Sequence, residues 1–208
     1  NIARDFNGGV YLYKHGDYEL AAKTFETILV KYPGHSRTDE ILFWYGESIG
    51  QLGRVEAALS TYRKLIAEHP ESKWLSRARF AAGRASMHLE QYADAASLFA
   101  AVVAEPSADK DLAIDGRILL AECHLKSGND TQAEPILREV LAIRKLPADK
   151  RLEAEFLLAT FMLRAGRPQE AMPLFARVAE RNGPHQAEAF VALGDAAYSV
   201  GKFLRSLE

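Results

Sequence analysis

The segments GDYELAAKTFETILVKYP (residues 16–33) and GRVEAALSTYRKLIAEHP (residues 53–70) align without a gap, and this similarity decides the fold. Three later segments align with them over their first fifteen residues: EQYADAASLFAAVVAEP (90–106), GNDTQAEPILREVLAI (128–143) and GRPQEAMPLFARVAER (166–181). The last stretch, GKFLRSLE (201–208), begins in the same way. A period of about 20–50 residues is the sequence signature of stacked supersecondary units. We therefore expect five units and the first part of a sixth.

The leading residues of the aligned segments fix the boundaries of the units. They are Gly16, Gly53, Glu90, Gly128, Gly166 and Gly201, which gives steps of 37, 37, 38, 38 and 35 residues. We expect one array over residues 1–206, and Leu207-Glu208 resembles a vector remnant. The units of this array are 1–36, 37–72, 73–108, 109–147, 148–184 and a truncated 185–206.

Each unit reads as two helices joined by a tight turn. An apolar run such as ILFWYGESIGQL (residues 41–52) precedes the turn, a second run follows it, and strand-like alternation is almost missing. Glycine supplies the backbone freedom that a helix C-cap needs, which Glu90 must achieve less comfortably. A small residue five positions after the turn and a large one four positions later share a helical face and fill one seam. These residues are Ala21, Ala58, Ala95, Ala133 and Ala171, followed by Phe25, Tyr62, Phe99, Leu137 and Phe175.

Prolines punctuate the helices. Pro33 and Pro70 should stop the second helices of the first two units, and Ser36 and Ser72 are suited to cap the helices that follow. Two further prolines, at positions 135 and 173, stand early in the second helices of units four and five. Proline costs little in the first turn of a helix but about 3 kcal/mol deeper in. We expect these two helices to start late or to bend.

Composition restricts the classes of partner. The chain is 48% hydrophobic and 26% charged, with a formal net charge of −2, so neither a nucleic acid nor an anionic membrane surface is an obvious partner. No apolar run approaches the roughly 18 residues that span a bilayer. The chain begins with Asn rather than Met, so we do not take residue 1 as the natural start. The single cysteine excludes an internal disulfide and says little about the redox compartment.

At this point the sequence resembles the tetratricopeptide repeat family over essentially its whole length. The resemblance rests on glycine at the eighth position of the unit, on Gly-x-Tyr/Phe at the turn, on the small and large series above and on the closing prolines. The eighth-position residues are Gly9, Gly46, Gly83 and Gly194, with Ala121 and Ala159 substituting. The period departs from the family's usual 34 residues because the links between units are longer. A longer link is similar to that of bacterial envelope members, including the outer-membrane assembly lipoprotein and the Tol-associated coordinator.

The resemblance implies an all-α, right-handed α-solenoid of about five and a half helix-turn-helix repeats with a concave groove. It also implies that the first helices line this groove and that the groove holds a partner. On this basis we predict that the groove binds protein through Tyr13, Glu40, Phe43, Trp44, Glu47, Arg77, Phe80, Arg84, His88, Glu122 and Tyr198.

The charges among these positions alternate between successive first helices. Glu47, Arg84 and Glu122 occupy equivalent positions, and so do Glu40, Arg77 and Asp115. One interpretation is a pair of salt-bridge ladders, although exposed ion pairs contribute only about 0–1 kcal/mol each. The other is that the two arginines receive an acidic side chain or a terminal carboxylate of a partner.

Aromatic residues set a second expectation for the groove. Chaperone-binding members of the family clamp a carboxylate with Lys and Asn, but this chain has Phe6, Val10 and Trp44 there and keeps only the cation Arg77. A chaperone-tail adaptor is therefore disfavoured. Trp44 either packs against the next helix or anchors a partner, since tryptophan is a frequent interface hot spot. We expect Trp74 to fasten the link before its helix.

The sequence offers little for catalysis. Cys123 and His124 are adjacent, so their side chains diverge by about 100° on a helix and cannot act as nucleophile and base on each other. Histidines are scattered, with no spacing typical of a metal site and no phosphate-binding glycine loop. We expect no cofactor and no metal.

Two functions remain open, with a distant third. The first is a non-catalytic protein-binding scaffold, with the periplasm or cell envelope as the expected location and the cytoplasm as the alternative. The second is the regulatory or substrate-recruiting array of a larger enzyme. RNA binding is opposed by the net charge and by acidic groove residues. Self-association is also predicted, through the apolar face that a truncated sixth unit would leave uncovered.

Overall fold

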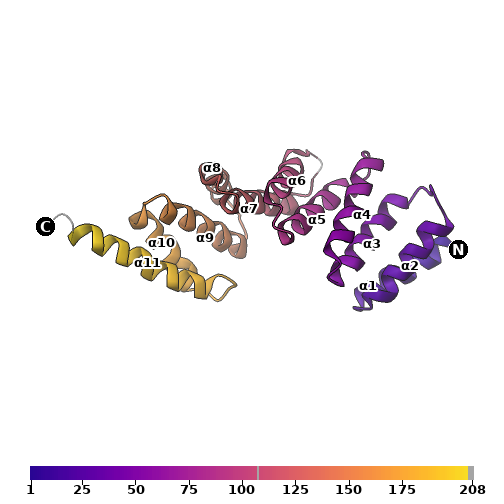
Figure 1. The fold of residues 1–208 in the computed structure, drawn as a ribbon, viewed down its shortest axis with the longest axis horizontal. Coiled ribbons are helices and arrows are strands. Elements are labelled where there is room, and N and C mark those ends of the chain that lie inside the picture. Colours follow the sequence, from indigo (N-terminus) through magenta and orange to yellow (C-terminus); the bar gives the residue numbers. More distant parts are fainter. Residues whose placement is uncertain (107, 206–208) are drawn as a thin grey trace. The chain divides into compact units, whose positions relative to one another are not determined.

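The computed structural model describes residues 1–106 and 108–205, with the side chains of 202–205 left aside. Within these residues the chain forms eleven α-helices and no strand. Helices α1 to α6 are Ile2–Lys14, Tyr18–Lys31, Thr38–Gln51, Val55–Glu68, Leu75–His88 and Tyr92–Ala104. Helices α7 to α11 are Lys110–Lys126, Asp130–Leu141, Ala148–Arg164, Pro168–Ala179 and Gln186–Arg205 (Figure 1). The chain is an α-solenoid of helix-turn-helix repeats, as the sequence predicted.

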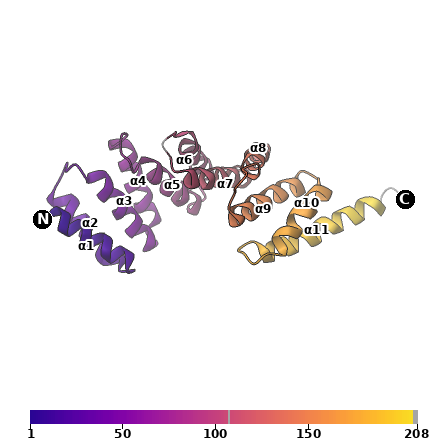
Figure 2. The ribbon, with the colours of Figure 1, turned by 180° about the vertical axis from the view of Figure 1, so that it is seen from behind.

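Residue contacts divide the chain into two compact units, which are described separately below. Unit 1 ends at Ala113 and unit 2 begins at Ile114, so the boundary falls inside α7. Unit 1 contains three complete helix pairs, α1/α2, α3/α4 and α5/α6. In unit 2, α9, α10 and α11 follow one another as packed neighbours (Figure 2). The single array over residues 1–206 stays a prediction, and the suggested vector residues 207–208 lie outside the described part.

The turns form where the sequence places them. Gly16, Gly53, Gly128 and Gly166 have φ between 71° and 82°, and Glu90 adopts a φ of 58° at the same position. The residue after each turn donates its N–H to the carbonyl five residues earlier, from Asp17 to Leu12 in the first repeat and from Gln91 to Ser86 in the third. This bond belongs to the Schellman type of helix ending, which satisfies a carbonyl that the helix leaves open.

The seam between paired helices is filled as predicted. The five alanines after the turns are 0–2% exposed, and Phe25, Phe99, Leu137 and Phe175 are fully buried. A Cβ placed on Gly9, Gly46 or Gly83 would lie only 2.6–2.8 Å from the ring of Phe25, Tyr62 or Phe99. The glycine of the first helix therefore leaves room for the aromatic ring of the second helix, and we call this position the socket.

The prediction fails at the C-terminal repeat. Gly201 starts no turn, because α11 continues through it to Arg205. A single glycine costs a helix only about 1 kcal/mol, which does not end it. Gly194 is not a socket either, since a Cβ there meets nothing within 4 Å, whereas Ala196 on the same helix is fully buried.

The two interior prolines do not delay their helices. α8 and α10 begin two residues after Gly128 and Gly166, the same offset as in α2 and α4. Pro135 and Pro173 are both exposed and lie inside these helices. The predicted late start is wrong because the turn, rather than the proline, fixes where each second helix begins.

The predicted helix caps at Ser36 and Ser72 are not formed, because α3 and α5 begin after Arg37 and Trp74 without a side-chain cap bond. The links instead share one side-chain bond to the N–H two residues later. His35, not Ser36, accepts the N–H of Arg37 through Nδ1 at 3.1 Å. Ser72 stands 37 residues later and accepts the N–H of Trp74 at 3.0 Å. His35 and Ser72 are therefore the equivalent residues, and the histidine ring nitrogen replaces the serine hydroxyl.

Candidate functional site

Four aromatic side chains meet on the first-helix side of unit 1. This aromatic cluster consists of Tyr13 from α1, Phe43 and Trp44 from α3, and Trp74 just before α5. The ring centroids are 5.1 Å apart for Tyr13 and Trp44, and 4.7 Å apart for the stacked pair Phe43 and Trp74. Phe43 is buried, but the other three side chains are only half-buried. Residues from three successive repeats therefore present one continuous aromatic surface.

Glu47 fixes the Tyr13 end of the cluster. Its carboxylate accepts a hydrogen bond from the hydroxyl of Tyr62 at 2.5 Å and a longer one from Tyr13 at 3.4 Å. Burial, with the nearby Glu47 charge, raises the pKa of Tyr13 to about 12 and raises that of Tyr62 as well. Both phenols remain protonated donors at neutral pH, so Glu47 joins α1, α3 and α4.

Two cations flank the other end of the cluster. The guanidinium carbon of Arg77 lies 5.4 Å from the centroid of the Trp74 ring, and the Lys73 ammonium nitrogen lies 5.8 Å from it. These distances are typical of cation–π contacts. Neither cation has an ion-pair partner among residues 1–106 and 108–205. Positive charge is thus available beside Trp74.

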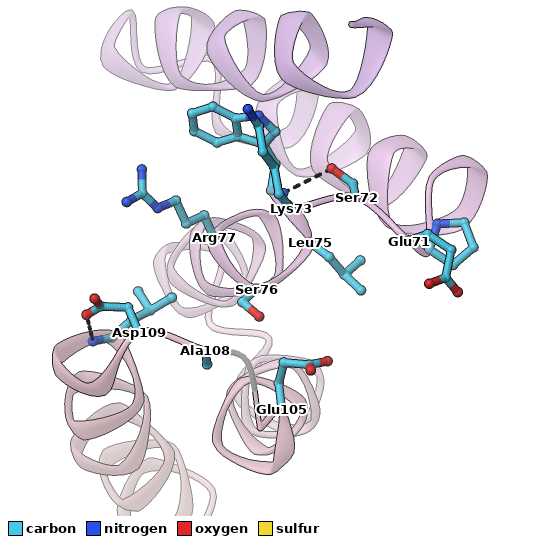
Figure 3. Close-up of a pocket in the computed structure, with 12 residues that line it drawn as sticks. Glu71, Ser72, Lys73, Leu75, Ser76, Arg77, Glu105, Ala108 and Asp109 are labelled. Atoms are coloured by element: carbon cyan, nitrogen blue, oxygen red, sulfur yellow. Dashed lines mark hydrogen bonds between the residues drawn. The ribbon is translucent and has the colours of Figure 1, made fainter. Parts of the chain in front are cut away.

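A cavity of about 520 Å³ adjoins this end of the cluster (Figure 3). We call it the first link pocket; it is lined by residues 70–77 and by Glu105, Ala108, Asp109 and Leu112. Two of its three anionic groups are engaged within the protein: Asp109 accepts the N–H groups of Asp111 and Leu112, and Glu105 lies 3.6 Å from Arg79. The third, Glu71, is exposed. In Figure 3, the side chains of Lys73 and Arg77 point away from Glu105, Ala108 and Asp109, which lie on the other side of the pocket. Within the described residues, the charged groups of this pocket without an ion pair or hydrogen bond are therefore Lys73, Arg77 and Glu71.

The link before α5 is held against α3 as expected. The hydroxyl of Ser72 donates to Asp39 at 2.5 Å, and Trp74 stacks on Phe43. Sequence reasoning gave Trp74 only this fastening role and did not include Lys73. Lys73 and Trp74 are the two residues after Ser72, and their place in the link is the signal that could have found them.

The remaining predicted groove residues occupy several environments. Phe80 packs on Phe99, with ring centroids 5.5 Å apart, while Arg84 and His88 are exposed on α5. Glu122 is half-buried in unit 2, and Tyr198 is 69% exposed on α11. The structure brings Tyr13, Phe43, Trp44, Glu47 and Arg77 together around the aromatic cluster. That the predicted set binds a ligand stays a prediction.

The salt-bridge ladders do not form within unit 1. Glu40 pairs with Arg37 at 2.9 Å, three residues away on the same helix, and Glu47 is used by the two tyrosines. In the described part of the chain, no ion pair joins Glu40 to Arg77 or Glu47 to Arg84. The predicted ladders are wrong here because nearer partners satisfy both carboxylates. Arg77 and Arg84 have no ion-pair partner among the described residues.

The Cys123 and His124 pair has no features of a nucleophile and base. Cys123 is fully buried, and burial raises the pKa of its thiol to about 12. Burial also lowers the pKa of His124. The thiolate is therefore scarce at neutral pH. The described residues contain no group of three or more candidate metal ligands, and none of their helices is long and apolar enough to cross a membrane.

Comparisons with known proteins agree with this architecture. A sequence model of the family described as tetratricopeptide repeat matches residues 6–73 and 156–207, and a second one matches residues 86–155. No curated protein matches the chain in sequence.

Several solved structures share the fold at low sequence identity. MamA from Desulfovibrio magneticus is 17% identical with a TM-score of 0.73, covering 86% of this chain and 93% of its own. TPR-like repeats of a kinesin light chain from Podosopora anserina are 20% identical with a TM-score of 0.69, covering 85% and 92%. YrrB, described as a TPR protein with an unusual peptide-binding site, is 21% identical with a TM-score of 0.64, covering 85% and 84%.

The family assignment rests on sequence and structure together. The two sequence models together match most of the chain, and each of them matches residues in both units. The repeats also carry the glycine turn and the glycine-to-aromatic socket. The chain therefore belongs to the tetratricopeptide repeat family.

Proposed function

We propose that the chain is a protein-interaction scaffold that binds a peptide or a domain of a partner through the aromatic cluster of unit 1. Tetratricopeptide repeats are generally protein–protein interaction modules. The observation that carries the proposal is the half-buried surface of Tyr13, Trp44 and Trp74, with two unpaired cations beside it.

The fold of unit 1 does not need most of the aromatic cluster to fill the seams between its paired helices. The seams of unit 1 are already filled by Phe25, Tyr62 and Phe99, so most of the aromatic cluster lies outside them. A half-exposed tryptophan loses much more water-accessible apolar area when a partner covers it than a buried one does. Trp, Tyr and Arg are also the residue types most enriched in interface hot spots.

The chemistry of the surface describes the partner. An apolar or aromatic side chain fits against Tyr13 and Trp44, and a carboxylate fits Arg77 and Lys73 beside Trp74. The bound segment would therefore combine an apolar anchor with an acidic residue or a C-terminal carboxylate. A peptide-binding site in YrrB, which has a similar fold, supports this class of ligand.

Affinity capture from the native host, followed by binding measurements with the captured partner, tests the proposal. Trp44→Ala should weaken binding by tenfold or more, because truncating a hot spot costs about 2 kcal/mol or more. Arg77→Glu should weaken it too. The matched controls are Tyr11→Ala, an aromatic that is 61% exposed on α1, and Lys64→Glu, exposed on α4. Helicity should be unchanged in all four variants. Wild-type affinity in both test variants would reject the assignment.

The second candidate is the recruiting array of a larger enzyme, in which the same surface would hold a substrate. The full-length gene separates the two settings. An export signal or lipid-attachment motif favours an envelope complex, to which the longer links also point. A catalytic domain next to the repeats favours the enzyme.

A further inference from the structure

Unit 2 contains a second cavity, of about 340 Å³, at the link before α11. We call it the second link pocket. It is lined by Asp149, Leu152 and Glu153 from α9, by Val178 from α10, and by residues 181–186. This volume is at the lower end of the range for ligand sites, about 300–1,000 Å³, so the cavity suits one side chain rather than a large cofactor.

Glu153 is a lining carboxylate of this pocket that has no counter-ion. It is half-buried, yet its carboxylate has no hydrogen bond or ion pair within the described residues. The nearest lysine is already used, because the Lys150 ammonium binds Asp115 at 2.5 Å. A partly desolvated carboxylate without a counter-ion costs free energy, and a ligand can recover that cost.

The groups around Glu153 are of both signs, and none of them pairs with its carboxylate within the described residues. Burial raises the pKa of its carboxyl, Asp115 and Glu122 raise it further, and Lys150 and His185 oppose them. Asp149 adds another carboxylate to the lining, and Arg181 is the one arginine in it. His185 is held with its ring stacked on Phe156 at 4.3 Å, and its Nδ1 lies 3.7 Å from a Glu188 oxygen.

The two link pockets occupy equivalent places in the repeat, and the sign of charge is reversed at equivalent lining positions. α6 and α10 begin at Tyr92 and Pro168, and α7 and α11 begin at Lys110 and Gln186, so one offset of 76 residues relates both pairs. The same offset pairs six lining residues of the first pocket with six of the second, and four of these pairs are ionisable: Lys73 with Asp149, Arg77 with Glu153, Glu105 with Arg181, and Asp109 with His185. The same backbone arrangement accepts either sign of charge at these lining positions, so folding does not require one sign. The sign of charge at each position can therefore serve to select a ligand.

We propose that the second link pocket binds a lysine or arginine side chain of the protein partner, with Glu153 as its counter-ion. The aliphatic part of that side chain would lie against Leu152, Val178 and Pro184, while its charged end reaches the carboxylate. The inference rests on the proposed function, because the side chain belongs to a protein partner. The partner would then present an anionic group to unit 1 and a cationic one to unit 2.

The pocket can be tested alone with a fragment that mimics arginine, n-butylguanidinium. Titrated into the ¹⁵N-labelled full chain, it should shift the amide resonances of Asn182 and Gly183 saturably. Glu153→Gln should weaken its affinity about tenfold, the loss expected for one charge-assisted hydrogen bond. Asp149→Asn, at a second lining carboxylate, should weaken it less. Glu139→Gln, at an exposed carboxylate on α8, is the matched control and should leave the affinity unchanged.

The outcomes separate this inference from the function proposed for unit 1. The inference is overturned by an absence of saturable shifts, by equal affinity in Glu153→Gln, or by similar shifts with n-butyrate. None of these results depends on Trp44 or Arg77. Conversely, a partner that ignores Trp44→Ala would reject the unit 1 assignment and leave the fragment result standing.

Discussion

At the scale of single residues, a missing side chain decides how closely the paired helices approach. A Cβ on Gly46 would lie 2.6 Å from the Tyr62 ring, whose hydroxyl is bound to Glu47. The ring therefore cannot withdraw without breaking that hydrogen bond. Gly194 on α11 has the same residue type but open space around it.

Substituting these two glycines by alanine should have opposite effects. Gly46→Ala should lower the free energy of unfolding, because overpacking costs about 1–3 kcal/mol and outweighs the gain in helix propensity. Gly194→Ala should raise it by about 1 kcal/mol, the gain expected in a helix interior. Urea denaturation followed by circular dichroism measures both. Equal changes in the two variants would contradict the socket.

Glu153 makes a prediction about pH and stability. Because burial raises its pKa in the fold, the native state holds this proton more tightly than the unfolded chain. Stability from this group is present below the unfolded pKa of about 4.5 and is lost as the pH rises through the folded value. Glu153→Gln should therefore raise the free energy of unfolding at pH 7, with a smaller gain at pH 4. The exposed Glu139→Gln should show no such pH-dependent gain.

At the scale of elements, one turn contains a residue poorly suited to its left-handed backbone conformation. Glu90 has a φ of 58° where the other turns have glycine. A left-handed conformation costs a side-chain-bearing residue about 1–2 kcal/mol. The third repeat therefore carries backbone strain that the others lack.

Exchanging glycine into and out of this turn position should show the strain. Glu90→Gly should raise the free energy of unfolding by about 1 kcal/mol, whereas Gly53→Ala should lower it by a similar amount. Denaturant midpoints of the two variants provide the measurement. A stabilising Gly53→Ala would show that the turn tolerates a side chain without strain.

The elements show which parts of the fold a sequence can predict. Turns and seams were predictable because they depend on residues within one repeat, such as Gly46 and Tyr62. The bond from the N–H of Arg37 to His35 was not predicted, because it depends on the place of His35 in the link and not on its residue type. The turn predicted at Gly201 was wrong because glycine permits a turn but does not enforce one.

The candidate site was less predictable than the fold. Its contacts join residues about one repeat apart, such as Tyr13 with Glu47 and Asp39 with Ser72. A position on a first helix therefore indicates exposure but not the partner that a side chain takes. Glu40 and Glu47 lie on the predicted helix face, but Glu40 pairs with Arg37 and Glu47 bonds to two tyrosines instead of the arginines of the ladder interpretation.

At the scale of the whole molecule, both units contain protonated groups buried in the fold. Tyr13 and Tyr62 belong to unit 1, and Cys123 belongs to unit 2; burial raises the pKa of all three. Each contributes stability below its unfolded pKa, about 9 for the thiol and 10 for the phenols. That contribution is lost as the pH rises toward the folded values.

The chain should therefore lose stability between about pH 9 and pH 12. Thermal melts across this range measure the loss. Tyr62→Phe removes one of the titrating groups, so its melting temperature should fall less steeply with pH than that of the wild type. A parallel pH dependence in the two proteins would rule out Tyr62 as a contributor.

The buried Cys123 also allows local opening of unit 2 to be measured by thiol labelling. It is the only cysteine, so a thiol reagent has one target, and that target lies in the core of unit 2. Modification must wait until the surrounding helices separate. When reclosing is faster than the chemical step, the labelling rate reports the population of the opened form. The rate would thus give the opening free energy around α7 and its neighbours without any engineered label.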